Sequence, residues 1–279
     1  MKFISLCLSY TNPQIKKIFA HMLATLSFKI FRVRRRLILS NLEKAFSSEL
    51  SLTERTSIAY QSVYHFMLTV IEFVAARRGD LAANVSFEGE QYLTEALAQG
   101  SGVYILCCHM GNWETMGAAI NKAFAPAHVV VKKVGSNSMN RFVCEQRELN
   151  GFRIIDRSGS SSANKLIKDT LKRKEIVGFV MDQSRPNEEK IPFFGHPAKT
   201  NSGLSILWRR NPVPLVPAHI ERIAVDHHVV KFGPAIEPIR SKDIKQDLKQ
   251  LTQRFNHEIE NIIKQKPEQY FWFHNRWKV

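Results

Sequence analysis

Short apolar runs alternate with longer amphipathic segments over most of the chain. The runs are bounded by glycine or polar residues, which predicts buried strands. They lie at residues 103–107, 129–131, 152–155, 176–181, 213–220 and 228–232. Apolar residues spaced three and four apart predict helices at 51–76, 90–99, from about 113, and at 138–150, 163–173, 202–210 and 243–264. This alternation favours an α/β fold with a mixed, largely parallel sheet flanked by helices.

The N-terminal segment differs in character from the rest of the chain. Its first 42 residues contain eight lysine or arginine residues and no acidic residue. Residues 15–31 are amphipathic but carry too many charges for a membrane span, which needs roughly 20 apolar residues. They also lack the uninterrupted apolar core of a cleaved signal peptide. The segment either lies in a membrane interface or packs on the domain with a solvated basic face, and the absence of acidic residues favours the membrane.

The charge of the whole chain limits its partners without choosing among them. Of the 279 residues, 40 are lysine or arginine and 25 are acidic, which gives a net charge of +15. Such a protein favours polyanions, and nucleic acid, anionic lipid and an acidic carrier protein all fit. The four cysteines form no CxxC pair and no metal-ligand spacing, which indicates buried thiols in a reducing compartment. We therefore expect no metal site and no bound cofactor.

The strongest candidate for catalytic chemistry follows the run at residues 103–107. His109 comes at the carboxyl end of this predicted strand, and Gly111 and Asn112 then break the pattern. If Glu114 lies in the first turn of the next helix, its carboxylate can converge on the imidazole. A histidine held by a carboxylate can take a proton from an alcohol, so the alcohol itself can attack an activated acyl group. Asn112, in the same turn, joins the candidates that orient a substrate.

Other candidate site residues follow neighbouring predicted strands. Asp182 and Gln183 end the run at 176–181, and Asp182 either orients the acceptor, supports the catalytic pair or caps a turn. Arg147 precedes the run at 152–155, Arg153 lies within it and Arg157 follows it. A guanidinium there can bind a phosphate or stabilise an oxyanion, although a solvated surface arginine is the commoner case. Lys132 and Lys133 carry the same ambiguity.

Two adjacent phenylalanines occupy a loop bounded by proline and glycine. Phe193 and Phe194 lie within Pro192-Phe-Phe-Gly195. They either line a groove for an acyl chain or are ordinary core residues. No GxSxG, GxxxxGK[ST], GxGxxG or HExxH motif occurs in the chain.

Four short sequence blocks, taken in their order along the chain, resemble the bacterial lipid A biosynthesis (lauroyl/myristoyl) acyltransferases of the lysophospholipid acyltransferase superfamily. They are Cys108-His-Met-Gly-Asn-Trp-Glu114, Asp182-Gln183, Pro192-Phe-Phe-Gly195 with Thr200-Asn-Ser-Gly203, and Tyr270-Phe-Trp-Phe-His-Asn-Arg276. Residues 34–46 and 52–55 also resemble the N-terminal region of that family. The Phe-Pro-Glu-Gly block typical of glycerolipid acyltransferases is missing, which argues against a phosphatidic acid synthase.

The resemblance implies a glycerol-3-phosphate acyltransferase-like domain over residues 41–279, preceded by a membrane-associated segment at 1–40. It implies an enzyme at the cytoplasmic face of a bacterial inner membrane, attached peripherally or by one N-terminal anchor. His109 would be the general base and Glu114 its partner. The donor would be an acyl thioester of acyl carrier protein or coenzyme A, and the acceptor a hydroxyl of a lipid A precursor or related glycolipid.

Three alternatives stay open on the sequence. The acceptor is an amino-acid lipid or a lysophospholipid, or water replaces it and the enzyme is a hydrolase. In another class, the chain is a non-catalytic protein that binds nucleic acid or anionic surfaces. That class shares the basic charge but leaves the pair of His109 and Glu114 unexplained, and no nucleic-acid module is recognisable. We therefore expect no nucleic-acid partner.

Overall fold

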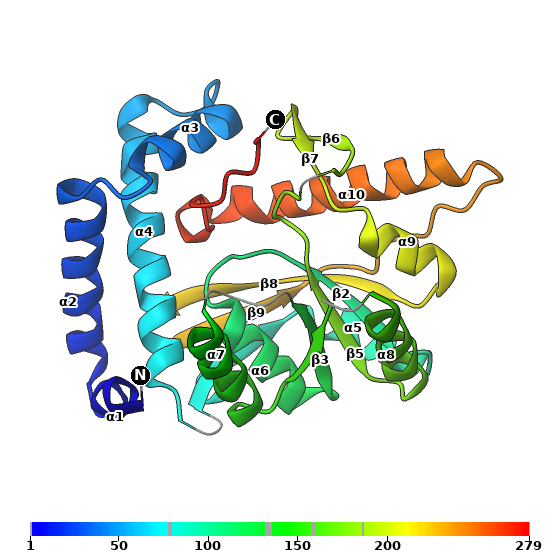
Figure 1. Cartoon of the computed structure of the whole chain (residues 1–279), viewed down its shortest axis with the longest axis horizontal. Helices are drawn as coiled ribbons and strands as arrows, with labels where there is room; N and C mark the ends of the chain where they lie inside the picture. Colours follow the sequence, from blue (N-terminus) through cyan, green and yellow to red (C-terminus); the bar gives the residue numbers. More distant parts are fainter. Residues whose placement is uncertain (1, 78–79, 132–135, 158–159, 186, 279) are drawn as a thin grey trace.

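The computed structural model describes residues 2–77, 80–131, 136–157, 160–185 and 187–278. Within these residues, a seven-stranded sheet and a separate hairpin are surrounded by helices (Figure 1). The strands of the sheet are β1 (Val85–Glu88), β2 (Val103–Cys107), β3 (Ala127–Val131), β4 (Arg153–Asp156), β5 (Ile176–Val180), β8 (Leu215–Ala224) and β9 (His227–Phe232).

The sheet is mixed and largely parallel, as the sequence predicts. Its strand order is β1-β9-β8-β2-β5-β3-β4, and β8 and β9 form its antiparallel pair. Strand β2 lies between β8 and β5 and runs parallel to both. All five of its residues are buried, which explains why this strand reads as an uninterrupted apolar run.

Helices cover both faces of the sheet. The helices after the N-terminal region are α4 (Leu52–Ala75), α5 (Glu90–Ala98), α6 (Trp113–Ala123), α7 (Asn137–Leu149), α8 (Ser160–Lys172), α9 (Gly203–Arg210) and α10 (Ile244–Gln265). Alternate β2 side chains enter two separate clusters: Tyr104 and Leu106 pack with α4, α8 and α10, whereas Val103 and Ile105 pack with α5 and α6.

The long helix α4 fills the predicted helical range and begins with a capping box. Ser51 and Glu54 form this box, in which each side chain bonds the other's backbone N–H. Within the described residues, α4 alone is long and apolar enough to cross a membrane, but 61% of that apolar window is buried inside the fold. Its buried residues join the main hydrophobic core, so α4 serves here as a core helix.

The N-terminal region consists of α1 (Lys2–Ser9), α2 (Pro13–Ala24), a π-helical segment at Thr25–Ile30 and α3 (Arg35–Phe46). Helix α2 packs alongside α4 (Figure 1). Its buried face, continued by the π-helical segment, contributes Ala20, Ala24 and Phe28 to the main core. The amphipathic segment expected at 15–31 is therefore helical, and one of its faces packs on the domain.

Three strands were missed by the sequence prediction. The edge strand β1 has only four residues, half of them exposed, and therefore lacks an apolar run. The hairpin of β6 (Lys190–Phe193) and β7 (His196–Lys199) contains two prolines. Proline cannot donate a strand hydrogen bond, so its presence argues against a strand in the sequence. It turns at Phe194 and Gly195, whose φ angles are both positive, as tight hairpins require.

Candidate active site

His109 lies where the sequence places it, at the carboxyl end of a central strand. Strand β2 ends at Cys107, and a short turn leads into α6, which begins at Trp113. The carboxyl edge of a parallel sheet is where α/β folds place their ligands. The His109 side chain is 21% exposed, so its ring is accessible within an otherwise buried turn.

Asp182 follows the neighbouring strand β5 and binds the His109 imidazole directly. Its Oδ1 lies 2.8 Å from Nδ1 of His109, and its Oδ2 accepts a hydrogen bond of 3.3 Å from the His109 backbone N–H. Because β2 and β5 are parallel neighbours, their ends bring together two residues that are 73 positions apart. This contact places Asp182 where it can orient the His109 ring.

The charge of Asp182 determines the tautomer of His109. Burial alone would raise the pKa of Asp182, but His109 and its hydrogen bonds hold that pKa below its ordinary value. An ionised carboxylate can only accept hydrogen bonds, so Nδ1 of His109 carries the hydrogen. In the neutral ring, Nε2 then has a free lone pair, as a general base requires.

Glu114 lies in the first turn of α6, as expected, but its carboxylate binds an arginine. Nε and one terminal nitrogen of Arg147 donate to its two oxygens at 2.9 and 2.7 Å. Trp113 Nε1 also donates to Glu114 at 3.2 Å. Burial would lower the pKa of Arg147, but the Glu114 carboxylate outweighs it and raises that pKa. The sequence predicted Glu114 as the hydrogen-bonded partner of His109. In the structure Asp182 binds the imidazole instead, and Glu114 binds Arg147.

The other candidates differ in how far the structure brings them to His109. Asn112 is fully buried, caps α6 by accepting from the Thr115 backbone N–H, and donates to Glu72. Gln183 is half-buried in the loop after Asp182. Arg157 follows β4 at the same edge, and one of its buried terminal nitrogens has no hydrogen-bond partner among the described residues. Burial lowers the pKa of Arg157 against the opposing charge of Glu188.

Phe193 and Phe194 are packed into the core. Phe193 is fully buried beneath the Arg276 guanidinium and beside Trp277. Phe194 contacts Phe46 and Trp272. The structure therefore agrees with the core interpretation of this pair. Lys132 and Lys133 lie outside the described residues.

A cluster of aromatic rings beside His109 was missed by the sequence prediction. The rings of Trp113 and Phe271 lie 5.0 and 5.9 Å from the imidazole, measured between centroids. Phe66 of α4 lies 5.0 Å from Phe271 and 5.1 Å from Phe273. We call Phe66, Trp113, Phe271 and Phe273 the aromatic wall. The alternating aromatics near the C-terminus were a visible signal, but nothing in the sequence placed them beside His109.

The C-terminal segment is held to the turn that carries His109 by hydrogen bonds between the two backbones. The Phe271 N–H donates to the His109 carbonyl at 2.9 Å, and the Gly111 N–H donates to the Gln269 carbonyl at 3.0 Å. His274 accepts from the Ser184 backbone N–H at 3.0 Å, and burial lowers its pKa. These residues fix the loop after Asp182 as well as the turn after β2. The described residues contain no group of three or more metal-ligating side chains suited to hold a metal ion.

Comparison with known proteins identifies the family. The profile described as "Bacterial lipid A biosynthesis acyltransferase" matches residues 4–279. The chain is also 25% identical over 134 residues to the phosphatidylinositol mannoside acyltransferase of Mycobacterium tuberculosis, in two strains. That match covers 47% of this chain and 42% of the relative, so it spans less than half the length of either protein. Because the family profile covers nearly the whole chain, we conclude that the protein belongs to the bacterial lipid A biosynthesis acyltransferase family.

Proposed function

We propose that the protein transfers a fatty acyl chain from an acyl thioester to a hydroxyl group of a glycolipid, with His109 as general base. The carrying observation is the 2.8 Å contact between Asp182 and Nδ1 of His109, which leaves Nε2 free at the accessible edge of the sheet. The family indicates a lipid A precursor or a related glycolipid as acceptor. The named activity of the mycobacterial relative also concerns a glycolipid.

The chemistry needs no nucleophile from the protein. Nε2 of His109 takes the proton of the acceptor hydroxyl while the hydroxyl oxygen attacks the thioester carbonyl. The tetrahedral intermediate collapses with cleavage of the carbon–sulfur bond, and the imidazolium returns the proton to the departing thiolate. Asp182 stabilises the imidazolium between these steps, because its buried carboxylate faces the protonated Nδ1.

The aromatic wall is the proposed surface for the acyl chain near the reacting carbonyl. Trp113 and Phe271 flank the imidazole, and Phe66 and Phe273 continue the apolar surface away from it. A fatty chain buries apolar area without hydrogen bonds, so stacked rings suit it. Phe193 and Phe194, which are core residues, are replaced in this role by the aromatic wall.

The positive charge of the chain supports an acidic, phosphate-bearing donor. Acyl carrier protein combines both properties, and the net charge of +15 would steer it to the enzyme. Arg157 is the proposed phosphate contact, because its guanidinium lies at the catalytic edge and has a buried nitrogen without a partner among the described residues. We expect transfer from the carrier-bound donor to slow as salt is raised.

The N-terminal region supplies the proposed attachment to the cytoplasmic face of the inner membrane. Its exposed large apolar residues are Leu6, Tyr10, Ile15, Ile18, Phe19, Met22, Ile30, Phe31 and Val33. A surface hollow of about 730 Å³ beside them is lined by Arg32, Arg34, Arg35, Arg36, Leu37 and Leu39. Exposed apolar side chains next to a cluster of arginines suit the boundary between acyl chains and anionic headgroups.

The test of the reaction is a mass-spectrometric transfer assay. Detergent-extracted protein is incubated with acyl carrier protein loaded with mixed chain lengths and with a lipid A precursor. We expect a lipid heavier by one acyl group that is missing with His109→Ala. Free fatty acid as the sole product would identify a hydrolase and overturn the proposal. Acylation of an amino-acid lipid or lysophospholipid offered in parallel, with no glycolipid product, would overturn the proposed acceptor.

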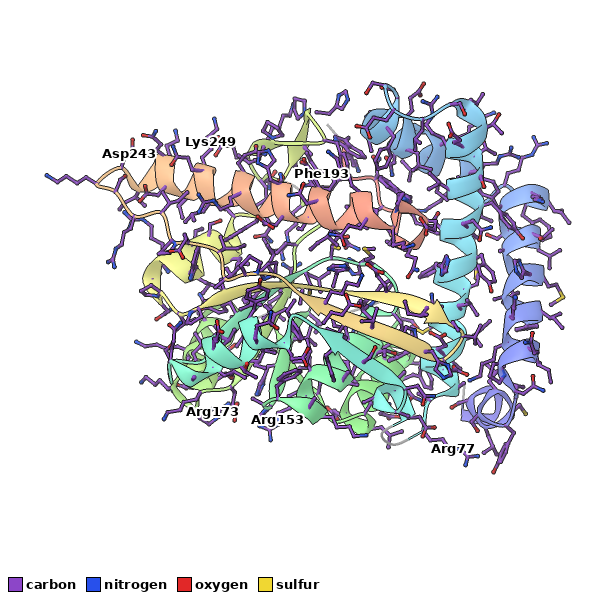
Figure 2. The ribbon with its side chains drawn as sticks, turned by 180° about the vertical axis from the view of Figure 1, so that it is seen from behind. Arg77, Arg153, Arg173, Phe193, Asp243 and Lys249 are labelled. Atoms are coloured by element: carbon purple, nitrogen blue, oxygen red, sulfur yellow. The ribbon has the colours of Figure 1, made fainter. Side chains whose placement is uncertain are left out.

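The test of attachment is sedimentation with vesicles of phosphatidylglycerol and phosphatidylethanolamine. Phe31→Glu places a charge in the proposed interface, where Phe31 is 71% exposed. The matched control is Ile244→Glu, because Ile244 is 59% exposed and follows Asp243, which lies at the end of the molecule opposite the N-terminal helices (Figure 2). We expect Phe31→Glu to reduce binding at least threefold and the control to leave it unchanged. Equal binding by both variants would contradict the proposed surface.

A further inference from the structure

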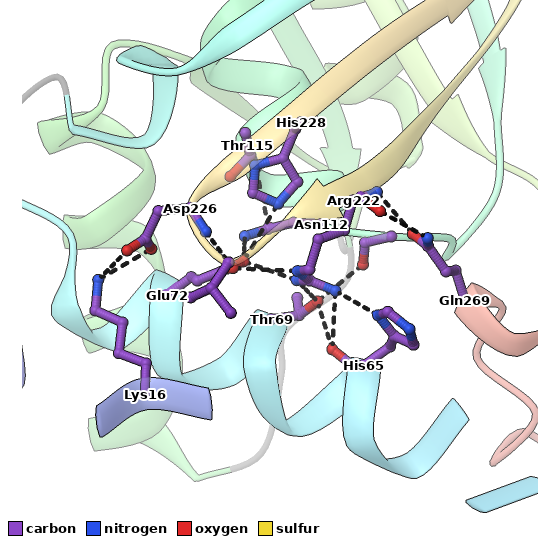
Figure 3. A network of polar contacts seen from close by, with 12 residues as sticks. Lys16, His65, Thr69, Glu72, Asn112, Thr115, Arg222, Asp226, His228 and Gln269 are labelled. Atoms are coloured by element: carbon purple, nitrogen blue, oxygen red, sulfur yellow. Dashed lines mark hydrogen bonds and ion pairs between the residues drawn. The ribbon is translucent and has the colours of Figure 1, made fainter. Parts of the chain in front are cut away.

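The turn that carries His109 rests against a buried network centred on Glu72 (Figure 3). Glu72 lies on α4 and is 4% exposed. Nδ2 of Asn112 donates to its Oε2 at 2.8 Å. Arg222 of β8 donates to both Glu72 oxygens, from Nε at 3.1 Å and from a terminal nitrogen at 2.7 Å. The carboxylate therefore joins the turn to both α4 and the sheet.

A second side chain of α4 touches the same turn. The Thr69 hydroxyl donates to the Gly111 carbonyl at 2.8 Å and accepts from Arg222 at 3.0 Å. Gly111 has a positive φ of 56°, and a side chain there would collide with the Ile220 carbonyl. The turn is thus pressed against β8 on one side and bonded to α4 on the other, which leaves it little freedom to shift.

Arg222 holds the network together. Besides Glu72 and Thr69, it donates to Nδ1 of His65 at 3.1 Å. Its backbone N–H and carbonyl both bond the Gln269 side-chain amide, at 2.7 and 3.0 Å. The Gln269 backbone carbonyl also accepts from the Gly111 N–H. Arg222 is therefore connected to the turn through Glu72, through Thr69 and through Gln269.

The charges of the network are balanced. Burial alone would raise the pKa of Glu72, but the charge and hydrogen bonds of Arg222, together with His228, whose Nε2 lies 3.4 Å from Oε2, hold that pKa well below its usual range. Burial, with the Arg222 charge, lowers the pKa of His65 to about 3, so its ring is neutral and can accept. The cluster contains one buried carboxylate facing one buried guanidinium. It extends through the Asp226 backbone, which donates to Glu72, to Lys16 on α2, which binds the Asp226 carboxylate.

We propose that Glu72 is a positioning residue for acyl transfer, acting on His109 through Asn112 and the turn. A buried ion pair is weak evidence for stability, because apolar residues of similar volume often stabilise a fold as well. Besides binding Arg222, Glu72 accepts from Asn112, three residues after His109. Arg222 also donates to Thr69 and His65 of α4, the helix beside the turn. A displacement of a catalytic group by about 1 Å can cost 10²-fold in rate, so such a hold has a direct effect on turnover. The inference rests on the proposed role of His109.

The main test exchanges the two partners of one hydrogen bond. Asn112→Asp keeps the cap of α6, because aspartate caps helices as well as asparagine, but it loses the donor and sets two carboxylates together. Glu72→Gln keeps the size of the side chain. Its amide nitrogen, however, faces a hydrogen-bond donor whether it takes the place of Oε1 or of Oε2, because both oxygens accept hydrogen bonds in the wild type. In the double variant, the new amide donates to the new carboxylate and the net charge of the cluster is restored. The amide nitrogen still faces the Arg222 terminal nitrogen that bonded Oε2, so the rescue is partial.

We expect each single variant to lower kcat by on the order of 10- to 100-fold with KM within about twofold, because positioning acts on the chemical step. The double variant should recover at least tenfold over Asn112→Asp. A double variant that folds as stably as the wild type but is no more active than Asn112→Asp would overturn the inference.

A milder pair of variants covers the case in which the network variants do not fold. Thr69→Val removes the hydrogen bond to Gly111 and the one from Arg222, which keeps its bonds to Glu72, and preserves the shape of the side chain. The control is Ser62→Ala, because Ser62 is equally buried on α4 but bonds only the Ala59 carbonyl of its own helix. We expect both variants to unfold at slightly lower temperature, and only Thr69→Val to lose kcat.

The two proposals fail in different ways. Full turnover by folded His109→Ala would overturn the proposed function itself. An inactive His109→Ala beside wild-type kcat in folded Thr69→Val would overturn the role of the network alone.

Discussion

Two histidine–carboxylate pairs with the same 2.8 Å contact lie at opposite edges of the sheet. His109 and Asp182 follow the carboxyl ends of β2 and β5. His128 and Glu175 lie at the amino ends of β3 and β5. Distance alone therefore does not distinguish a candidate base from a structural pair.

The two pairs differ in the ring nitrogen that is bound and in the cations around the carboxylate. His128 uses Nε2 and its side chain is 5% exposed, whereas His109 uses Nδ1 and is 21% exposed. Glu175 also accepts from Arg173 at 2.9 Å, near Arg153, so its charge is already balanced (Figure 2). Arg173 is the main reason that the pKa of Glu175 is lowered, and burial lowers the pKa of His128. The His109 pair is distinguished by its more exposed ring and by a carboxylate that, within the described residues, accepts no hydrogen bond from an arginine.

Replacing each histidine with alanine gives the largest expected contrast. His109→Ala should lower kcat by about 10²- to 10⁴-fold, the usual contribution of general acid–base catalysis. His128→Ala should leave kcat within about twofold, because it touches no part of the site. Release of free thiol from the acyl thioester in the presence of acceptor measures both. Comparable losses in the two folded variants would remove the distinction between the pairs.

Replacing the two carboxylates sharpens the comparison. Asp182→Asn removes the charge that faces the imidazolium and allows the wrong tautomer, so kcat should fall by about 10²- to 10⁴-fold. The matched variant Glu175→Gln should retain turnover and lose stability instead. If Asp182→Asn retained wild-type kcat, Asp182 would not be the group that orients His109.

The location of the site was predictable from the sequence, whereas its hydrogen-bonded pairs were not. The apolar runs before His109 and Asp182 identify strand ends, and parallel neighbours bring such ends to one edge. The sequence does not show that β5 pairs with β2, so Glu114, only five residues from His109, was the natural choice of partner. The aromatic wall combines α4, α6 and the C-terminal segment, and Glu72 meets Arg222 across 150 positions. Contacts of this kind depend on tertiary packing that hydrophobic periodicity does not encode.

Variants of the Glu114–Arg147 pair test whether Glu114, the predicted partner of His109, has a role in catalysis. Breaking a buried ion pair from one side typically costs about 3–5 kcal/mol, so Glu114→Gln and Arg147→Met should each lower the free energy of unfolding by about that amount. Glu114→Leu combined with Arg147→Met should recover part of it. Urea denaturation measures the stability, and thiol release the activity of the fraction that folds. A loss of kcat in folded Glu114→Gln as large as that of Asp182→Asn would restore Glu114 to the catalytic centre.

The smallest expected effect is a pH dependence at the amino edge of the sheet. The pKa of His128 lies below its ordinary value of 6.5, so the unfolded chain takes up a proton there before the folded one does. The stability contributed by the neutral ring is therefore fully present above about pH 6.5 and is lost as pH falls toward the lowered pKa.

The variant that isolates this dependence is His128→Leu, which should unfold about 1–3 kcal/mol more easily at neutral pH, because Glu175 loses a buried donor. The gap between wild type and variant should narrow between about pH 7.5 and 5.5. Glu175 does not interfere in that window. Its pKa is lowered from the ordinary value of 4.5, so the stability that it contributes changes with pH only below about pH 4.5. Urea denaturation at the two pH values measures the gap. A gap that widens on acidification would mean that His128 is protonated in the folded protein and would contradict this prediction.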